Sequence, residues 1–156
     1  MNGDGYADVI VSALNYDDPG QEDEEKGAAF VFPGSASQPS GTPPGSNWIN
    51  PADVIGVMKG DQAGNGVSSA RGVGDINGDG YCDVMWGNPF YRVTSGGIDG
   101  VVYVFLGSKD GIVGTDVEDA ALKLYSEQSA TCFGASIAPA SDVNGDGFTD
   151  LIICEQ

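Results

Sequence analysis

The sequence repeats a short acidic loop whose oxygen-bearing residues stand at the spacing of metal ligands. Two complete copies follow the pattern D-x-N-x-D-G-x-x-D, at residues 75–83 and 142–150. A third copy, at residues 2–8, has the same pattern without its first aspartate. Hard oxygen donors at alternate positions, with a glycine that lets the chain turn back on itself, suit Ca²⁺. The spacing therefore predicts calcium-binding loops, and their recurrence predicts a repeat protein.

Each loop offers ligands from the same positions: side-chain oxygens of residues one, three, five and nine, and the main-chain carbonyl of residue seven. The predicted ligands are Asp75, Asn77, Asp79, Asp83 and the Tyr81 carbonyl in one loop, Asp142, Asn144, Asp146, Asp150 and the Phe148 carbonyl in the next, and Asn2, Asp4, Asp8 and the Tyr6 carbonyl in the shortened copy. Because it lacks one acid, the shortened copy is expected to bind calcium weakly or not at all. Asn-Gly-Asp-Gly also forms a good hairpin turn without a metal, but three copies, each closed by aspartate at the same offset, favour calcium.

An EF-hand begins with the same residues but is excluded by those after the ninth position. An EF-hand needs a glutamate at position 12 and a helix on each side of the loop. Position 12 is Trp86 in one complete loop and Ile153 in the other. The residues after each loop form a short β-branched or bulky apolar run, which is typical of a strand. We therefore expect the loop to join two strands, with the acid at position 9 closing the metal site.

The chain is strongly acidic, with 23 acidic residues against 6 basic ones, no histidine and a formal net charge of −17 over 156 residues. Nucleic acid is an unsuitable partner, because phosphate binding needs a basic face. An anionic membrane surface is disfavoured for the same reason, and no apolar run is long enough to insert into a membrane. Part of the acidic excess lies in residues 17–25, which we interpret as a solvated loop.

Three cysteines, Cys82, Cys132 and Cys154, are unevenly spaced and form no CxxC pair. Their number and spacing do not make a disulfide framework. In a chain without histidine, a zinc site and a Cys–His nucleophile are also disfavoured. We interpret the three thiols as small packing residues.

The segments between the loops repeat as well. An apolar strand follows each loop, and three further short strands precede the next loop. The predicted strands lie at 6–13, 82–87 and 148–154, within 27–35 and 100–108, at 54–58 and 121–125, and at 66–74 and 133–141. Four strands per glycine-rich repeat, with no helix, predict the blades of a β-propeller. The predicted fold class is therefore all-β, with blades of four antiparallel strands.

Two further matches make this pattern specific. Residues 133–134 read Phe-Gly, and residues 102–108 read V-Y-V-F-L-G-S. Together with the acidic loops, they resemble the FG-GAP repeats of integrin α-subunit propellers and of many bacterial surface proteins. The middle repeat departs from the family with Asn65-Gly66 at its opening, and the family's Gly-Ala-Pro turn is present only as Gly87-Asn-Pro89 and the weaker Ser12-Ala-Leu14. The resemblance covers nearly the whole chain and implies calcium-binding propeller blades.

Aromatic residues of the strands are expected to serve packing and not ligand binding. Tyr103, Phe105, Phe30 and Phe32 recur at equivalent repeat positions with a period of two, which is how blades pack face to face. Trp48 differs, because it lies in a segment rich in proline and glycine. It is the aromatic residue that we retain as a candidate contact residue.

The chain is expected to form an incomplete propeller, since closed propellers use four to eight blades. Residues 1–62 should form a partial blade that lacks its inner strand, residues 63–130 a complete blade, and residues 131–156 the start of a third. The simplest interpretation is a piece of a longer propeller. The alternative is a ring in which copies of the chain associate through their open blade edges.

These features predict a calcium-stabilised structural or binding module. Low-affinity calcium modules operate where calcium is plentiful, so we expect an extracellular or cell-surface location. The resemblance adds adhesion to a protein or glycan partner of unknown identity. Two alternatives stay open: a self-assembling ring or filament of two-blade units, and the non-catalytic part of a secreted propeller enzyme such as a polysaccharide lyase. No enzyme activity is expected of this segment, because its recurring carboxylates are assigned to calcium and it has no histidine.

Overall fold

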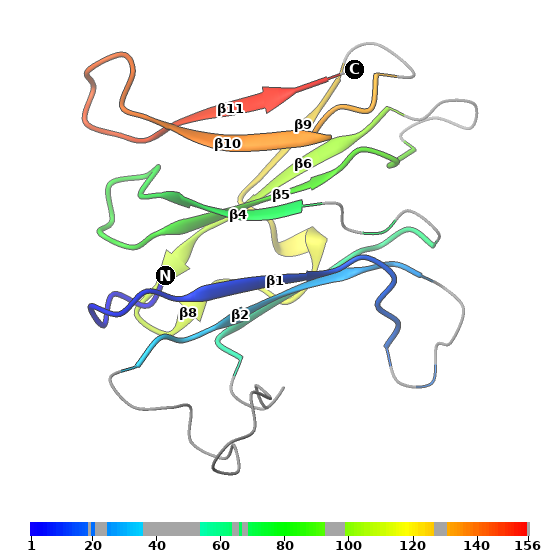
Figure 1. The fold of residues 1–156 in the computed structure, drawn as a ribbon, viewed down its shortest axis with the longest axis horizontal. Coiled ribbons are helices and arrows are strands. Elements are labelled where there is room, and N and C mark those ends of the chain that lie inside the picture. Colours follow the sequence, from blue (N-terminus) through cyan, green and yellow to red (C-terminus); the bar gives the residue numbers. More distant parts are fainter. Residues whose placement is uncertain are drawn as a thin grey trace.

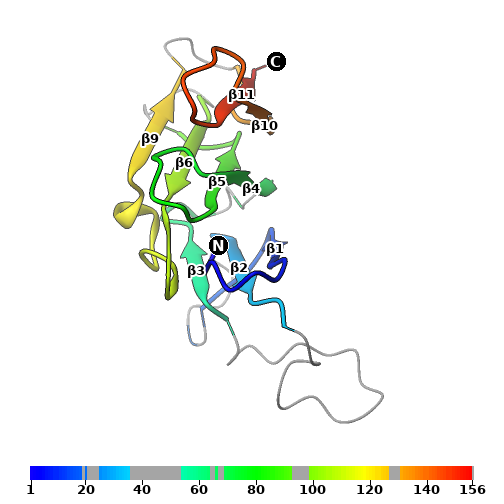
Figure 2. The same cartoon turned by 90° about the vertical axis from the view of Figure 1, so that its left-hand side faces the viewer.

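The fold is known from a computed structural model that describes residues 1–18, 20, 25–35, 54–63, 66, 69–92, 99–126 and 131–155. Trp48 and most of the acidic run at 17–25 lie outside the described residues. Figure 1 shows three groups of strands stacked one above the next along the molecule, and Figure 2 shows them from the side. Every sheet is antiparallel.

The sheets contain three, four and two strands in chain order. The first sheet has the order β1-β2-β3, with β1 at Val9–Ala13, β2 at Ala28–Phe32 and β3 at Gly56–Lys59. The second has the order β4-β5-β6-β9, with β4 at Ser69–Gly74, β5 at Asp83–Asn88, β6 at Val101–Phe105 and β9 at Leu122–Tyr125. The third pairs β10 at Ser136–Ser141 with β11 at Asp150–Cys154. The all-β fold of partial propeller blades, predicted from the sequence, is confirmed.

The three sheets fall within the predicted segments 1–62, 63–130 and 131–156, whose boundaries stay a prediction. The strands that follow the acidic loops begin later than predicted, because the first residues of each predicted strand still belong to the loop. The described residues add two small elements to the predicted strands. A short hairpin of β7 (Gly107–Ser108) and β8 (Gly111–Ile112) is followed by a 3₁₀ turn at Val117–Asp119. This turn is capped by the Asp116 side chain, which accepts a hydrogen bond from the Glu118 amide.

The two central strands of the second sheet, β5 and β6, are buried on both faces. Alternate side chains of a strand point to opposite sides, so each face forms a cluster of its own. All residues of β5 and β6 are buried. On one face, Trp86, Tyr103 and Phe105 pack with Ala29, Val31 and Met58 of the first sheet. On the other face, Met85, Val102 and Val104 pack with Ile137 of the third sheet, and Leu151 and Ile153 border this cluster. The sheets therefore pack face to face, as propeller blades do.

Equivalent aromatic residues differ in burial because the chain places a sheet beside only some of them. Tyr103 and Phe105 are covered by the first sheet and are almost fully buried. Phe30 and Phe32 occupy the same repeat positions in β2 but are only half-buried. They lie on the face of β2 opposite Ala29 and Val31, where no sheet formed by the described residues packs. The expected core role is thus complete for one pair and partial for the other.

Packing between the second and third sheets predicts a large effect at Met85. Met85 is fully buried in the cluster that joins them. Replacing buried methionine with alanine leaves a cavity, so Met85→Ala should lower the free energy of unfolding by about 2–5 kcal/mol. Leu122→Ala is the matched control, because this β9 side chain is exposed and its loss should cost about 0.5 kcal/mol or less. Urea denaturation of the two variants gives the comparison, and equal losses would contradict the packing described.

Candidate metal-binding loops

The two complete acidic loops are hairpin connections at one end of their sheets. Residues 75–82 join β4 to β5, and residues 142–149 join β10 to β11. A register shift precedes each loop, between Gly72 and Gly74 in β4 and between Pro139 and Ser141 in β10. The N-terminal copy leads into β1, and all three loops project from the same side of the molecule (Figure 1). The loops therefore form a series along one side, one loop for each sheet.

Identical hydrogen bonds shape the three loops. The third residue accepts a bond from the amide of the fifth, and the fifth accepts one from the amide of the seventh. Amide-to-oxygen distances for the first contact are 3.2 Å for Asp4 to Asn2, 3.0 Å for Asp79 to Asn77 and 2.9 Å for Asp146 to Asn144. For the second contact they are 2.9 Å each, from Tyr6 to Asp4, Tyr81 to Asp79 and Phe148 to Asp146. These side chains therefore turn inward over the main chain of their own loop.

Glycine at positions four and six permits this turn. Both positions have positive φ angles, a region that L side chains rarely adopt. The φ angles are 72° and 86° at Gly3 and Gly5, 80° and 91° at Gly78 and Gly80, and 81° and 92° at Gly145 and Gly147. The repeated Asn-Gly-Asp-Gly is thus a backbone requirement as well as a source of oxygen ligands.

The first aspartate of each complete loop is surrounded by main-chain amides. Asp75 accepts hydrogen bonds from the amides of Gly80, Gly78 and Asp79, at 2.8, 2.7 and 3.2 Å. Asp142 accepts the equivalent bonds from Gly147, Gly145 and Asp146 at 2.9, 2.6 and 3.0 Å. These amide donors, that of the sixth residue above all, lower the pKa of both carboxyl groups. Both side chains are therefore anionic at neutral pH.

The ninth aspartate fastens the loop to the rest of its sheet. Asp83 is fully buried, and its two oxygens accept bonds from the Ile76 amide at 2.9 Å and the Gly107 amide at 2.7 Å. Ile76 is the second residue of the same loop. Gly107 lies after β6 and is the first residue of β7. Each carboxylate oxygen accepts one of these bonds, which leaves lone pairs for a cation. The ninth aspartate thus has a structural role that the sequence analysis did not assign.

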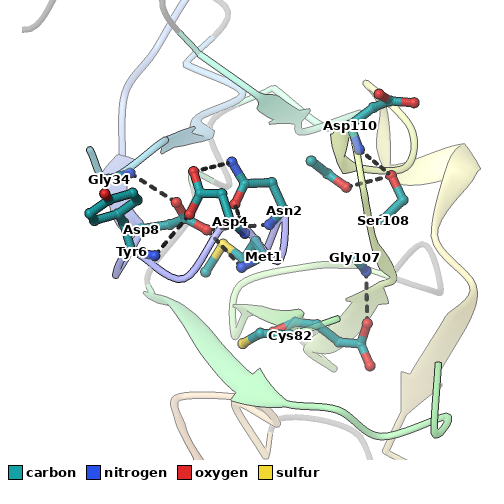
Figure 3. A network of polar contacts seen from close by, with 12 residues as sticks. Met1, Asn2, Asp4, Tyr6, Asp8, Gly34, Cys82, Gly107, Ser108 and Asp110 are labelled. Atoms are coloured by element: carbon teal, nitrogen blue, oxygen red, sulfur yellow. Dashed lines mark hydrogen bonds and ion pairs between the residues drawn. The ribbon is translucent and has the colours of Figure 1, made fainter. Parts of the chain in front are cut away.

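The same contacts recur around Asp8 (Figure 3). The Gly34 amide donates to one oxygen at 2.9 Å, and the Met1 ammonium donates to the other at 2.6 Å. In the third loop, the Val143 amide donates to Asp150 at 2.8 Å. Met1 and Val143 thus occupy the position that Ile76 has in the second loop. The contact is therefore a property of the repeat and not of one sheet.

Two glycines outside the calcium motif complete this arrangement. A Cβ atom at Gly34 would lie 2.2 Å from the Ala7 carbonyl oxygen, and one at Gly107 would lie 2.4 Å from the Cys82 carbonyl oxygen. Only glycine lets the turn approach closely enough for its amide to reach the ninth aspartate. The sequence signal for both residues was the glycine-serine pair at the end of a repeated strand, which was interpreted as part of that strand and its turn.

Electrostatic surroundings differ between the ninth aspartates. Burial raises the pKa of Asp83, and the negative charges of Asp79 and Asp75 raise it further, against the two amide bonds that lower it. Burial also opposes ionisation of Asp8, but the Met1 ammonium and the Gly34 amide outweigh it and lower the pKa of Asp8. The complete loop therefore concentrates negative charge that no cation of the described residues offsets.

The donor set of the complete loops suits a hard cation. In the described residues, lysines form ion pairs with Asp18, Asp110 and Glu118, and none pairs with an aspartate of a complete loop. No group of three or more histidine, cysteine, aspartate or glutamate side chains among the described residues is close enough to hold a metal ion. The residues nevertheless fit Ca²⁺ chemically, because every side-chain donor is a carboxylate or amide oxygen.

Comparison with known proteins identifies the repeat. Residues 72–105 and 133–153 match the FG-GAP repeat. Integrin alpha-PS3 of Drosophila melanogaster is 31% identical over 156 residues, covering 98% of this chain. Integrin alpha-3 of Mus musculus is 36% identical over 97 residues, or 62% of this chain. Phosphatidylinositol-glycan-specific phospholipase D of Bos taurus is 31% identical over 153 residues, or 98% of this chain.

The chain therefore carries FG-GAP repeats and is similar to a segment of integrin α subunits, as the resemblance implied. It spans only a small part of these relatives: 12% of the Drosophila integrin, 9% of the mouse integrin and 17% of the bovine phospholipase D. Among the residues that the structure describes, no helix has the length and apolar character needed to cross a membrane.

The contacts of Asp83 predict a loss of stability that does not depend on calcium. Asp83→Ala would leave the Ile76 and Gly107 amides without their acceptor, and the Gly107 bond is buried. We expect the free energy of unfolding to fall by about 3 kcal/mol in excess chelator. Asp110→Ala removes a carboxylate that is highly exposed and should cost less than about 1 kcal/mol. Denaturant titration measures both, and an unchanged midpoint for Asp83→Ala would contradict the structural role.

Proposed function

We propose that the chain is a calcium-stabilised binding module of an extracellular or cell-surface protein, which mediates adhesion to a protein or glycan partner. The observation that carries the proposal is the threefold repetition of one oxygen-rich loop with identical internal hydrogen bonds. Similarity to integrin α subunits supports the adhesive and surface setting. The net charge of −17 disfavours nucleic acid and anionic membranes as partners.

In each complete loop, the side chains of residues one, three, five and nine and the carbonyl of residue seven would hold the cation. The residues are Asp75, Asn77, Asp79, Asp83 and Tyr81, and Asp142, Asn144, Asp146, Asp150 and Phe148. Bound calcium supplies positive charge where the carboxylates of one loop repel each other. Asn2, Asp4, Tyr6 and Asp8 form the weak counterpart, because this copy lacks the first acid of the motif.

Calcium acts here as a source of folding free energy. A ligand that binds only the folded state stabilises it in proportion to the logarithm of its concentration over the dissociation constant. At a calcium concentration about 100 times the dissociation constant, each complete loop gains about 2.7 kcal/mol. Two such gains form a large share of the stability of an ordinary domain. The module is thus expected to be rigid where calcium is plentiful and weakened where it is scarce.

The segment itself is proposed to be non-catalytic, although one relative is named a phospholipase D. The recurring carboxylates of the described residues are engaged with loop amides. The whole chain contains no histidine to act as a base. In a longer enzyme, the same blades would serve as a rigid accessory part.

Calcium removal is the direct test of the metal assignment. Excess chelator should lower the melting temperature of the wild-type chain, and added calcium should restore it. The double variant Asp79→Ala/Asp146→Ala lacks the central acid of each complete loop, so its melting temperature should respond far less to calcium. Differential scanning fluorimetry over a calcium titration measures both. A wild-type melting curve that does not change with chelator would contradict the proposal.

The binding role has its own test. The fluorescently labelled chain, loaded with millimolar calcium, should bind saturably to intact cells or to extracellular matrix, and chelator should release it. Asp110→Ala serves as a matched charge control that should bind as the wild type does, because Asp110 lies outside the loops and is exposed. Flow cytometry or surface plasmon resonance measures the binding. Calcium-dependent folding without saturable binding to either surface would leave a structural module and refute the adhesive role.

A further inference from the structure

Neighbouring acidic loops contact each other through an aromatic residue that the calcium motif does not specify. The seventh residue of a loop places its ring against the fourth residue, a glycine, of the loop before it. A Cβ atom at Gly3 would lie 2.9 Å from Cε1 of Tyr81, and one at Gly78 would lie 2.7 Å from Cε1 of Phe148. The contact occurs twice between the same two loop positions, so it belongs to the repeat.

A main-chain hydrogen bond reinforces the contact between the second and third loops. The Thr149 amide donates to the Asp75 carbonyl oxygen at 3.2 Å. A Cβ atom at Gly74 would lie 2.7 Å from Thr149 Oγ1, so this side chain also lies against the start of the second loop. Phe148 and Thr149 thus touch the second loop at its fourth and first residues. They connect the two loops at two points in the first half of the second loop.

Phe148 and Thr149 lie among the proposed metal ligands of the third loop, so their contacts can link metal binding in the two loops. Thr149 lies between the Phe148 carbonyl and Asp150, and all three are fixed if the third loop closes around a cation. Asp75, which receives the Thr149 bond, is the first proposed ligand of the second loop. Ordering of one loop therefore restrains a ligand of its neighbour. A ligand that binds an already ordered site loses less conformational entropy, which makes binding at the two sites cooperative.

We propose that Phe148 and Tyr81 are positioning residues that couple adjacent loops, so that order in one loop is transmitted to the loop before it. The proposal rests on the proposed calcium function only in naming the ligand, since the contacts exist without a metal. Where the ligand is calcium, occupancy of the third loop raises the affinity of the second. By thermodynamic linkage, occupancy of the second loop raises the affinity of the third by the same factor.

The test reads each loop separately by nuclear magnetic resonance of the ¹⁵N-labelled 156-residue chain. Amide signals of Gly78 and Gly80 report the second loop, and those of Gly145 and Gly147 report the third. Calcium is titrated into the wild type and into Asp142→Asn/Asp146→Asn, which disables the third loop. We expect the second loop of this variant to bind calcium about fivefold more weakly.

Phe148→Ala decides whether the aromatic contact carries the coupling. In the Phe148→Ala chain, disabling the third loop should leave the affinity of the second loop unchanged. Val143→Ala is the matched control, because Val143 is a highly exposed apolar residue of the same loop. Its bond to Asp150 comes from the main-chain amide, which alanine keeps. The effect of about fivefold should persist in that chain. An effect of that size that survives Phe148→Ala, or that is absent from a wild-type chain that binds calcium, would overturn the proposal.

A measurement without metal separates this proposal from the calcium function. In excess chelator, Phe148→Ala should speed hydrogen exchange of the Gly78 and Gly80 amides, which bond Asp75, whereas Val143→Ala should not. Faster exchange in a chain that binds no calcium would refute the calcium function and retain the coupling. Unchanged exchange would overturn the coupling, whatever the loops bind.

Discussion

The hydrogen bonds accepted by the ninth residue of each acidic loop, an aspartate, are the constraint on which the loop and its sheet depend. They are complete at Asp83, whose carboxylate is buried. Asp83 accepts one amide bond from its own loop and one from Gly107, which follows β6. The contact joins segments 24 residues apart and fixes the end of the hairpin over the neighbouring strand. An ionised group is costly to bury without donors. The two amides offset part of this cost, and they explain why an aspartate and a close-approaching glycine recur together.

Around this contact, stability and ligand binding use the same residues. Main-chain amides lower the pKa of Asp75 and Asp142, while burial and neighbouring charges work against ionisation of Asp83 and raise its pKa. A loop that carries such repulsion in the absence of a cation gains from binding one. The hydrophobic clusters on both faces of the second sheet supply a rigid base for the loop. Calcium would then add to a fold whose core is formed by packing alone.

The three acidic loops contact one another in series, so they are not structurally independent sites. Because each aromatic residue lies on a glycine of the preceding loop, the proposed metal sites and the packing of the sheets are parts of one structure. Under the proposed function, calcium bound in these loops would stiffen the blades along one side.

The sequence by itself determined the repeat, the strand order, the oxygen-rich loops and the FG-GAP family, because these depend on local spacing and on φ angles that only glycine readily adopts. It also predicted that the aromatic residues of the repeated strands serve packing. Tertiary structure decided what depends on neighbours distant in the chain. Tyr103 is buried and Phe30 only half-buried at equivalent positions, since within the described part of the chain a sheet covers only Tyr103. The role of Gly107 and the contact of Phe148 with Gly78 likewise depend on segments that meet only after the sheets have packed, and no local pattern records which segments those are.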